Sequence, residues 1–120
     1  LEFVTLTHLA REPARVLSGG QRKLLELARV LMADPRIILL DEPAAGVKPS
    51  LLEVIIDRII EINRRGTTFL IIEHNMDMIA RLCRHVFVMA TGKLRCEGTP
   101  AAVAADPRVI EAYLGGGHLA

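Results

Sequence analysis

Two adjacent carboxylates, Asp41 and Glu42, follow directly after an uninterrupted apolar run at residues 37–40. Such a run is typical of a strand that is buried on both faces of a parallel sheet. Acidic side chains at the carboxyl end of such a strand lie where open α/β sheets bind ligands. Asp41 would hold Mg²⁺ through water, because Mg²⁺ keeps part of its hydration shell, and Glu42 would polarise an attacking water molecule. The alternative is a solvated acidic loop that caps the next element.

A histidine, His74, follows a second stretch of apolar and β-branched residues at 67–72, which predicts a second strand. Strand, helix and strand in this order form a right-handed unit with parallel strands. His74 would therefore leave the sheet at the same edge as Asp41 and Glu42. The alternative is a histidine that caps a helix or is merely buried.

A third candidate group is Ser18, Gly19, Gly20 and Gln21. Ser18 followed three residues later by Gln21 is a capping box, which predicts that a helix begins here. The two glycines carry no Cβ, so another surface could approach the backbone closely. A helix N-terminus with bare backbone N–H groups is a phosphate-binding device. The alternative is an ordinary helix start with a capping box.

Helical periodicity and turn residues predict the elements that would position these groups. One helix begins at Ser18 and extends to about residue 33, and another extends from residue 49 or 50 to about 65, where Gly66 ends it. The remaining elements are strands at 37–41, 67–72, 85–90 and 93–97, and helices at 76–84, 100–105 and 106–113. The strands at 85–90 and 93–97 would form a C-terminal hairpin, with Leu94 and Cys96 on one of its faces. The predicted architecture is α/β, with parallel strands, flanking helices and a C-terminal β-hairpin.

Three segments in this order resemble the nucleotide-binding subunit of ABC transporters. LSGGQ at 17–21 resembles the ABC signature, IILLDE at 37–42 resembles the Walker B strand, and LIIEH at 70–74 resembles the switch-histidine segment. The stretches DEPAAGVKP, IIEHNMDMI and EGTPAAVAADPRVIEAYLG resemble the ATPases of branched-chain amino acid importers. Residues 17–114 thus resemble the C-terminal half of the ATPase domain, after the end of a helical subdomain at 1–16 and before a flexible tail at 115–120.

The resemblance implies a partial P-loop NTPase sheet and the ATP-hydrolysing subunit of an importer, with ATP and Mg²⁺ as cofactors. It implies that Asp41, Glu42 and His74 act on nucleotide held by their own chain, where His74 bonds the terminal phosphate or holds the attacking water. Residues 18–21 would act on nucleotide held by the opposite chain, so the complete site needs a head-to-tail dimer. The other implied partners are transmembrane permease subunits, which place the protein in the cytoplasm at the inner face of the plasma membrane.

No G-x-x-x-x-G-K-[ST] motif occurs in the 120 residues, so the backbone cradle and lysine that hold the β- and γ-phosphates are absent from them. We therefore expect the chain alone to be inactive as an ATPase. Two alternatives stay open: a non-catalytic module that docks onto a complete ATPase subunit, and a soluble ABC-type ATPase without a membrane partner. Lys48 stands where the family usually has an acidic residue or Asn, in the loop that crosses the dimer interface.

The composition argues against several other classes of function. The chain has a formal charge of +1, and its basic residues form no stripe with interleaved aromatic residues, which argues against nucleic-acid binding. The two cysteines, Cys83 and Cys96, are too few for a disulfide framework or a zinc site and indicate reduced thiols. No segment of the sequence is apolar enough to span a membrane. The first residue is Leu1 rather than Met, which indicates a fragment or a processed product.

The resemblance also predicts a gap in the sheet. In the family, the phosphate-loop strand lies between the strands that we expect at 67–72 and 85–90. Without it, backbone groups on both sides of the gap have no partner. We therefore expect the isolated chain to be marginal in stability, oligomeric or rearranged, rather than a rigid monomer with three strands in one continuous sheet.

Overall fold

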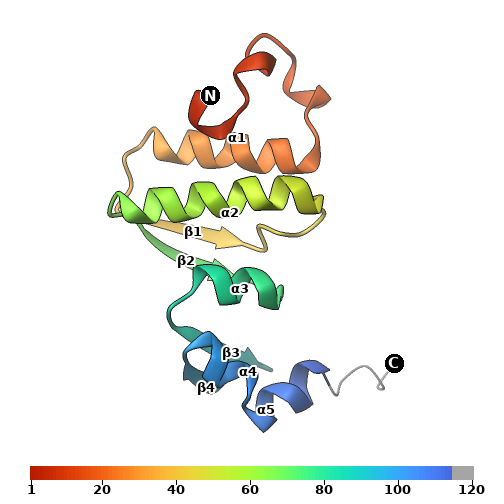
Figure 1. The fold of residues 1–120 in the computed structure, drawn as a ribbon, viewed down its shortest axis with the longest axis vertical. Coiled ribbons are helices and arrows are strands. Elements are labelled where there is room, and N and C mark those ends of the chain that lie inside the picture. The colour runs from red at the N-terminus through yellow and green to blue at the C-terminus, as the bar shows by residue number, and fades with distance from the viewer. Residues whose placement is uncertain (115–120) are drawn as a thin grey trace. The chain divides into compact units, whose positions relative to one another are not determined.

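The structure, a computed structural model, describes residues 1–114, which form two compact units (Figure 1). The first unit is Leu1–Asn75, and the second begins at Met76. The predicted tail at residues 115–120 lies outside the described residues. All residues of the candidate groups named above fall in the first unit.

The first unit contains two long helices, two strands and three short 3₁₀ turns near the N-terminus. In chain order these are η1 (Glu2–Val4), η2 (Thr7–Leu9), η3 (Ala14–Val16), α1 (Gly19–Leu31), β1 (Ile37–Asp41), α2 (Pro49–Arg64) and β2 (Thr68–Ile72). Each long helix follows its sequence signals: Ser18 caps α1, Pro49 opens α2, and Gly66 follows α2 with φ +105°. The helices and strands predicted for this part of the chain are therefore confirmed to within about two residues.

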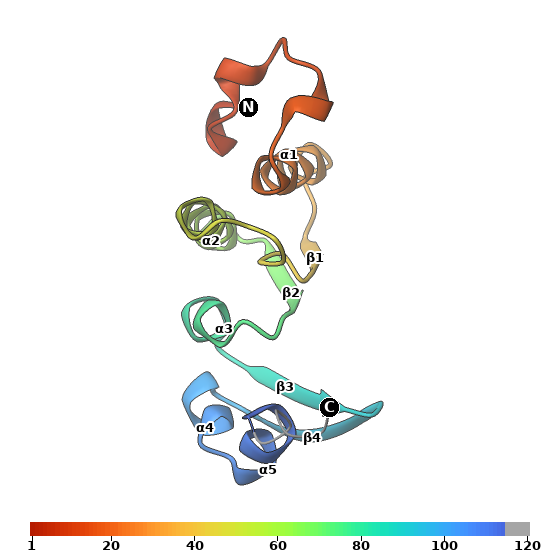
Figure 2. The ribbon, with the colours of Figure 1, turned by 90° about the vertical axis from the view of Figure 1, so that its right-hand side faces the viewer.

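Strands β1 and β2 pair in parallel, in a register that runs from Ile37 opposite Thr68 to Asp41 opposite Ile72. Helices α1 and α2 lie side by side, and Figure 2 shows both nearly end-on beside the strands. The core of the unit joins both helices to β1 through buried aliphatic side chains, with partly buried apolar residues packed around them. These are Leu27, Ile38 and Ile62, surrounded by Phe3, Leu31, Leu40 and Phe69.

Only one face of this sheet is covered within the unit. Side chains alternate along β1, so that Ile38 is 3% exposed while its neighbour Leu39 is 69% exposed. Leu70 and Ile72 of β2 are exposed in the same way. The expectation that the apolar run at 37–40 is buried on both faces is therefore wrong for this structure, because both helices pack against the same face.

The second unit contains an antiparallel hairpin and short helices. Its elements are α3 (Met76–Leu82), β3 (Val86–Ala90), β4 (Lys93–Gly98), α4 (Pro100–Ala104), α5 (Pro107–Val109) and a final π-helical turn, η4 (Ile110–Leu114). Thr91 and Gly92 form the hairpin turn with φ of 51° and 72°. The core of this unit is formed by Val88, Val103 and Val109. The predicted C-terminal hairpin is confirmed.

One detail of the hairpin differs from the expectation. Val88 pairs with Cys96, but the next residue, Met89, pairs with Leu94, so that Arg95 is an extra residue in β4. This β-bulge places Leu94 beside the exposed Met89, while Cys96 packs near the core. Leu94 and Cys96 therefore do not share one face.

The strands of the described residues form two separate two-stranded sheets, β1–β2 and β3–β4. Each sheet lies within one of the two units, so the expected gap between the strands at 67–72 and 85–90 stays a prediction. The α/β class, with a parallel pair, flanking helices and a C-terminal hairpin, is as predicted.

Candidate functional site

The parallel register brings the chain segments after β1 and β2 to the same edge of the sheet. There Nδ1 of His74 lies 3.2 Å from Oε1 of Glu42. The two side chains are 70% and 50% exposed, so water and a ligand can reach both. The sequence prediction that these residues meet at one edge is borne out by this geometry.

The backbone of Glu42 is held in an unusual conformation. Its φ is +47°, in the left-handed region that a side chain with a Cβ rarely adopts. Its N–H donates to the carbonyl of Ile72 over 2.8 Å, and its own carbonyl accepts from Nζ of Lys23 over 2.8 Å. A backbone outlier fixed from both sides by the surrounding structure is characteristic of functional sites.

Glu73 links the two loops that carry Glu42 and His74. Its Oε1 accepts from the backbone N–H of Ala44 over 2.8 Å. Its Oε2 accepts from the N–H groups of His74 and Asn75 over 2.9 and 3.0 Å. The sequence gives Glu73 no role of its own. The only signal for Glu73 in the sequence is its position: its carboxylate comes directly after the strand predicted at 67–72, which ends beside the loop that carries Glu42.

Asp41 is the last residue of β1 and is exposed. Within residues 1–114, its carboxylate has no hydrogen-bond or ion-pair partner. The described part of the chain also contains no group of three or more His, Cys, Asp or Glu side chains that could hold a metal ion. Mg²⁺ bound to nucleotide needs only one or two protein carboxylates, since water and phosphate oxygens fill the other positions. The free carboxylate of Asp41 fits that requirement.

The start of α1 has the predicted capping box in full. Oγ of Ser18 accepts from the N–H of Gln21 over 3.2 Å, and Oε1 of Gln21 accepts from the N–H of Ser18 over 2.9 Å. The side chain of Gln21 is thus turned back onto the helix end. Within residues 1–114, no hydrogen bond or ion pair joins residues 18–21 to Asp41, Glu42 or His74. The structure therefore brings Glu42 and His74 together and joins residues 18–21 to neither of them.

The two glycines of this segment have different surroundings. A Cβ on Gly20 would lie 2.9 Å from Cγ of Leu51, so that the Leu51 side chain would have to shift, and 3.1 Å from Cγ1 of Val47, which is a tight contact. A Cβ on Gly19 would lie 3.6 Å from the carbonyl oxygen of Gly46, an ordinary contact. The expectation that both glycines leave room for an outside surface is therefore wrong for Gly20, which is buried against its own chain.

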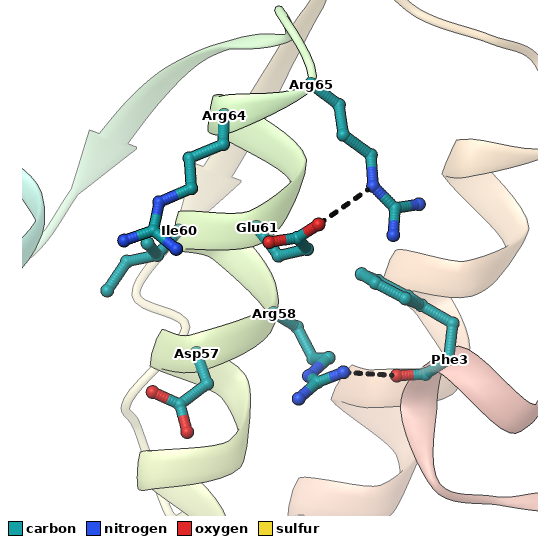
Figure 3. A pocket seen from close by; sticks show the side chains of 7 residues that line it. All are labelled: Phe3, Asp57, Arg58, Ile60, Glu61, Arg64 and Arg65. Carbon is teal, nitrogen blue, oxygen red and sulfur yellow. Dashed lines mark hydrogen bonds and ion pairs between the residues drawn. The ribbon is translucent and has the colours of Figure 1, made fainter.

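A shallow hollow lies elsewhere in the first unit, between η1 and the end of α2 (Figure 3). There the ring of Phe3 lies about 5 Å from the guanidinium groups of Arg58 and Arg65. Arg58 donates to the carbonyl of Phe3 over 3.3 Å, and Arg65 pairs with Glu61 over 3.2 Å. None of the candidate site residues lines this hollow. The contacts of Phe3 with Arg58 and Arg65 attach the N-terminal turn η1 to α2.

Two family models match the two ends of the chain. Residues 1–45 match the ABC transporter family, and residues 96–119 match the branched-chain amino acid ATP-binding cassette transporter family. Within residues 1–114, no helix combines the length and the apolar character that crossing a bilayer requires.

Individual relatives agree with these matches. A probable branched-chain amino acid transport ATP-binding protein, LivG of Archaeoglobus fulgidus, is 44% identical over 115 residues, which cover 96% of this chain and 45% of the relative. A lipopolysaccharide export ATP-binding protein, LptB of Haemophilus influenzae, is 37% identical and is covered to 48%. The chain thus spans about half the length of the curated relatives it matches.

A solved structure extends the likeness to the fold. The ADP conformation of an ATP-binding cassette of an ABC transporter superposes with a TM-score of 0.86 at 44% identity, over 96% of this chain and 47% of that one. Sequence and three-dimensional arrangement therefore point to the same relatives. Over 96% of its length, the chain is similar to about half of an ABC transporter ATP-binding subunit, including those of branched-chain amino acid transporters.

Proposed function

We propose that the chain is the part of an ABC ATPase subunit that hydrolyses ATP to power the import of branched-chain amino acids. The observation that carries the proposal is the 3.2 Å contact between His74 and Glu42 at the carboxyl end of a parallel sheet. The family match at residues 96–119 supports the substrate class, because it is specific to branched-chain amino acid transporters.

Each residue at the sheet edge has a defined role in this proposal. Glu42 polarises a water molecule that attacks the γ-phosphorus of ATP, the bond to the bridging oxygen breaks, and ADP and phosphate leave. His74 hydrogen-bonds the γ-phosphate or holds that water in line. Asp41 would hold Mg²⁺ through water, and a bound Mg²⁺ would supply charge neutralisation at the phosphate oxygens.

The start of α1 acts on a second nucleotide in this proposal. Oγ of Ser18 already accepts a hydrogen bond from Gln21, so its hydroxyl hydrogen is available for donation to a phosphate of the opposite subunit. Gly19, in only ordinary contact with the chain, allows that phosphate to approach the helix end. The functional assembly is then a head-to-tail dimer of ATPase subunits that binds transmembrane permease subunits at the cytoplasmic face of the membrane.

A chimera tests the proposal. In it, this chain replaces the matching part of the LivG relative from Archaeoglobus fulgidus, whose other half lies outside the match. We expect the purified chimera to hydrolyse ATP in the presence of Mg²⁺, and Glu42→Gln to reduce turnover by about a hundredfold or more. A folded chimera that binds ATP but keeps its turnover after Glu42→Gln would contradict the catalytic role.

A second candidate function is a non-catalytic module that docks onto a complete ATPase subunit. The observation that favours it is that the 120 residues contain no phosphate-loop motif. The same chimera distinguishes the two functions. A chimera that folds and binds nucleotide but does not hydrolyse ATP would favour the docking module over the ATPase.

A further inference from the structure

We propose that Glu73 is a positioning residue that holds the loops carrying Glu42 and His74 at a fixed separation. The inference rests on the proposed ATPase function, because it concerns the same two catalytic side chains. Glu73 itself does not contact the reacting atoms. It acts through the backbone of the residues around them.

The carboxylate of Glu73 has one oxygen for each loop. Oε1 accepts from the N–H of Ala44, which lies two residues after Glu42, and Oε2 accepts from the N–H groups of His74 and Asn75. A carboxylate has lone pairs for all three bonds. The three bonds measure 2.8 to 3.0 Å, within the usual range for hydrogen bonds from N–H to oxygen.

The bond to Ala44 completes the restraint on Glu42. The N–H of Glu42 is bonded to Ile72, and its carbonyl accepts from both Lys23 and the N–H of Ala45. These bonds fix the peptide groups on either side of a residue with φ +47°. Without Glu73, the segment after Glu42 would lose the hydrogen bond that links Ala44 to the turn that holds His74, and the left-handed backbone could relax.

A purely local role for Glu73 is the alternative, in which the carboxylate only caps its own turn at His74 and Asn75. Glu73→Asp separates the two roles. An aspartate can still bond to backbone N–H groups one and two residues ahead, as in an Asx turn. Its side chain is one methylene shorter and cannot also reach Ala44. A local role predicts that this variant is neutral, whereas the positioning role predicts that it is impaired.

Glu73→Gln removes one of the two acceptors and keeps the length of the side chain. The amide has a single oxygen, so its nitrogen must face at least one of the backbone N–H groups. The matched control is Glu61→Gln, because Glu61 is also a partly exposed glutamate whose carboxylate has a close partner, Arg65, but it lies on α2 away from the site.

The first measurement is amide hydrogen exchange in the 120-residue chain. We expect the N–H of Ala44 to exchange about tenfold faster in Glu73→Asp and Glu73→Gln than in the unchanged chain, and Glu61→Gln to leave it unchanged. In Glu73→Asp the N–H of Asn75 should keep its protection. Unchanged exchange at Ala44 in both variants would overturn the proposal.

The second measurement is ATP turnover in the chimera, which also covers the case in which a variant of the isolated chain does not fold. We expect Glu73→Asp to lower kcat about tenfold and to leave KM for ATP within about twofold, since positioning affects the chemical step. Unchanged kcat, or a change confined to KM, would overturn the positioning role. Failure of the proposed function gives a different result, namely Glu42→Gln without effect while Ala44 still loses its protection in the Glu73 variants.

Discussion

His74 and Glu42 follow different strands, yet the parallel pairing of β1 with β2 places Nδ1 of one 3.2 Å from Oε1 of the other. Both side chains are at least half exposed, so their contact contributes little to the free energy of folding. It lies at the edge where open α/β sheets bind ligands, which supports the chemical role that we propose for the two residues.

The first prediction concerns His74→Ala in the chimera. We expect ATP turnover to fall by about 10²–10⁴-fold, because the hydrogen-bonding group at the γ-phosphate or the attacking water is lost. The free energy of unfolding, measured by urea titration, should change by less than about 1 kcal/mol. Full turnover in the variant would contradict the assignment of His74 to the site.

The hairpin supplies a matched control for this prediction. Nε2 of His85 lies 3.2 Å from Oε2 of Glu97, the same separation, and these side chains are also about half exposed. His85→Ala therefore removes an equivalent contact from the second unit and changes no residue of the β1–β2 sheet. Turnover should be unchanged in this variant, and an equal loss in both variants would indicate a general effect of removing a histidine.

The second prediction concerns the glycines at the start of α1. Gly20→Ala should destabilise the chain by about 1–3 kcal/mol, because the new Cβ would overlap the side chain of Leu51. Gly19→Ala should change stability by less than about 1 kcal/mol, because its Cβ would make an ordinary contact. Chemical denaturation of the two variants measures the difference.

Leu51 provides the check on that mechanism. If the clash is the cause, the double variant Gly20→Ala with Leu51→Ala should show a smaller loss than the sum of the two single losses, by about 0.5–3 kcal/mol. Additive losses would show that Gly20 is needed for another reason, such as its backbone conformation.

Local signals in the sequence are enough to predict most elements of this fold. The capping box at Ser18 and Gln21 sets the start of α1, and Gly66 sets the end of α2. These signals act within a few residues of the chain, so they are present in the sequence itself. The placement of Asp41, Glu42 and His74 is equally predictable, because parallel strands bring their carboxyl ends to the same edge.

Tertiary partners are what the sequence does not reveal. That Gly20 is buried against Leu51, and that Glu73 bonds to Ala44, depends on how two segments far apart in the chain meet. The apolar run at 37–40 shows that both faces of β1 could be buried, but not whether a second layer covers Leu39. The bulge at Arg95 is likewise a property of the pairing between two strands, not of either strand alone.

The third prediction concerns pH and the second unit. Hydrogen bonds from the side chain and the backbone N–H of Arg108 lower the pKa of Asp106 from 3.8 to about 2. Because the pKa is lower in the folded state, the stability contributed by this pair is present above pH 4, about the ordinary pKa, and is lost as the pH falls toward 2. A carboxyl-detected NMR titration should give a midpoint near 2 for Asp106.

Two variants define the cause of that shift. Arg108→Ala should raise the pKa of Asp106 only part of the way to its ordinary value, because the backbone N–H of residue 108 still donates. Arg95→Ala should leave the midpoint unchanged, since Arg95 bonds to Thr91 instead. An Asp106 midpoint near 4 in the unchanged chain would show that the contact with Arg108 does not persist in solution.

The fourth prediction concerns the uncovered face of the β1–β2 sheet. Leu39 and Leu70 lie opposite each other in the register and are 69% and 53% exposed. Contiguous apolar surface of this kind promotes association in water. We therefore expect the isolated chain to self-associate, and the double variant Leu39→Thr with Leu70→Thr to lower the average mass in sedimentation equilibrium. Threonine is β-branched and suits a strand, so folding should be retained.

The neighbouring residue on the covered face distinguishes association from loss of structure. Ile38 is 3% exposed and packs in the core, so Ile38→Ala should cost about 2–5 kcal/mol of unfolding free energy without removing the apolar patch. The threonine variant should instead have a lower average mass and nearly unchanged stability. If it unfolds as readily as Ile38→Ala, the outer face contributes to the core. If the unchanged chain is monomeric at high concentration, the exposed leucines do not form an association surface.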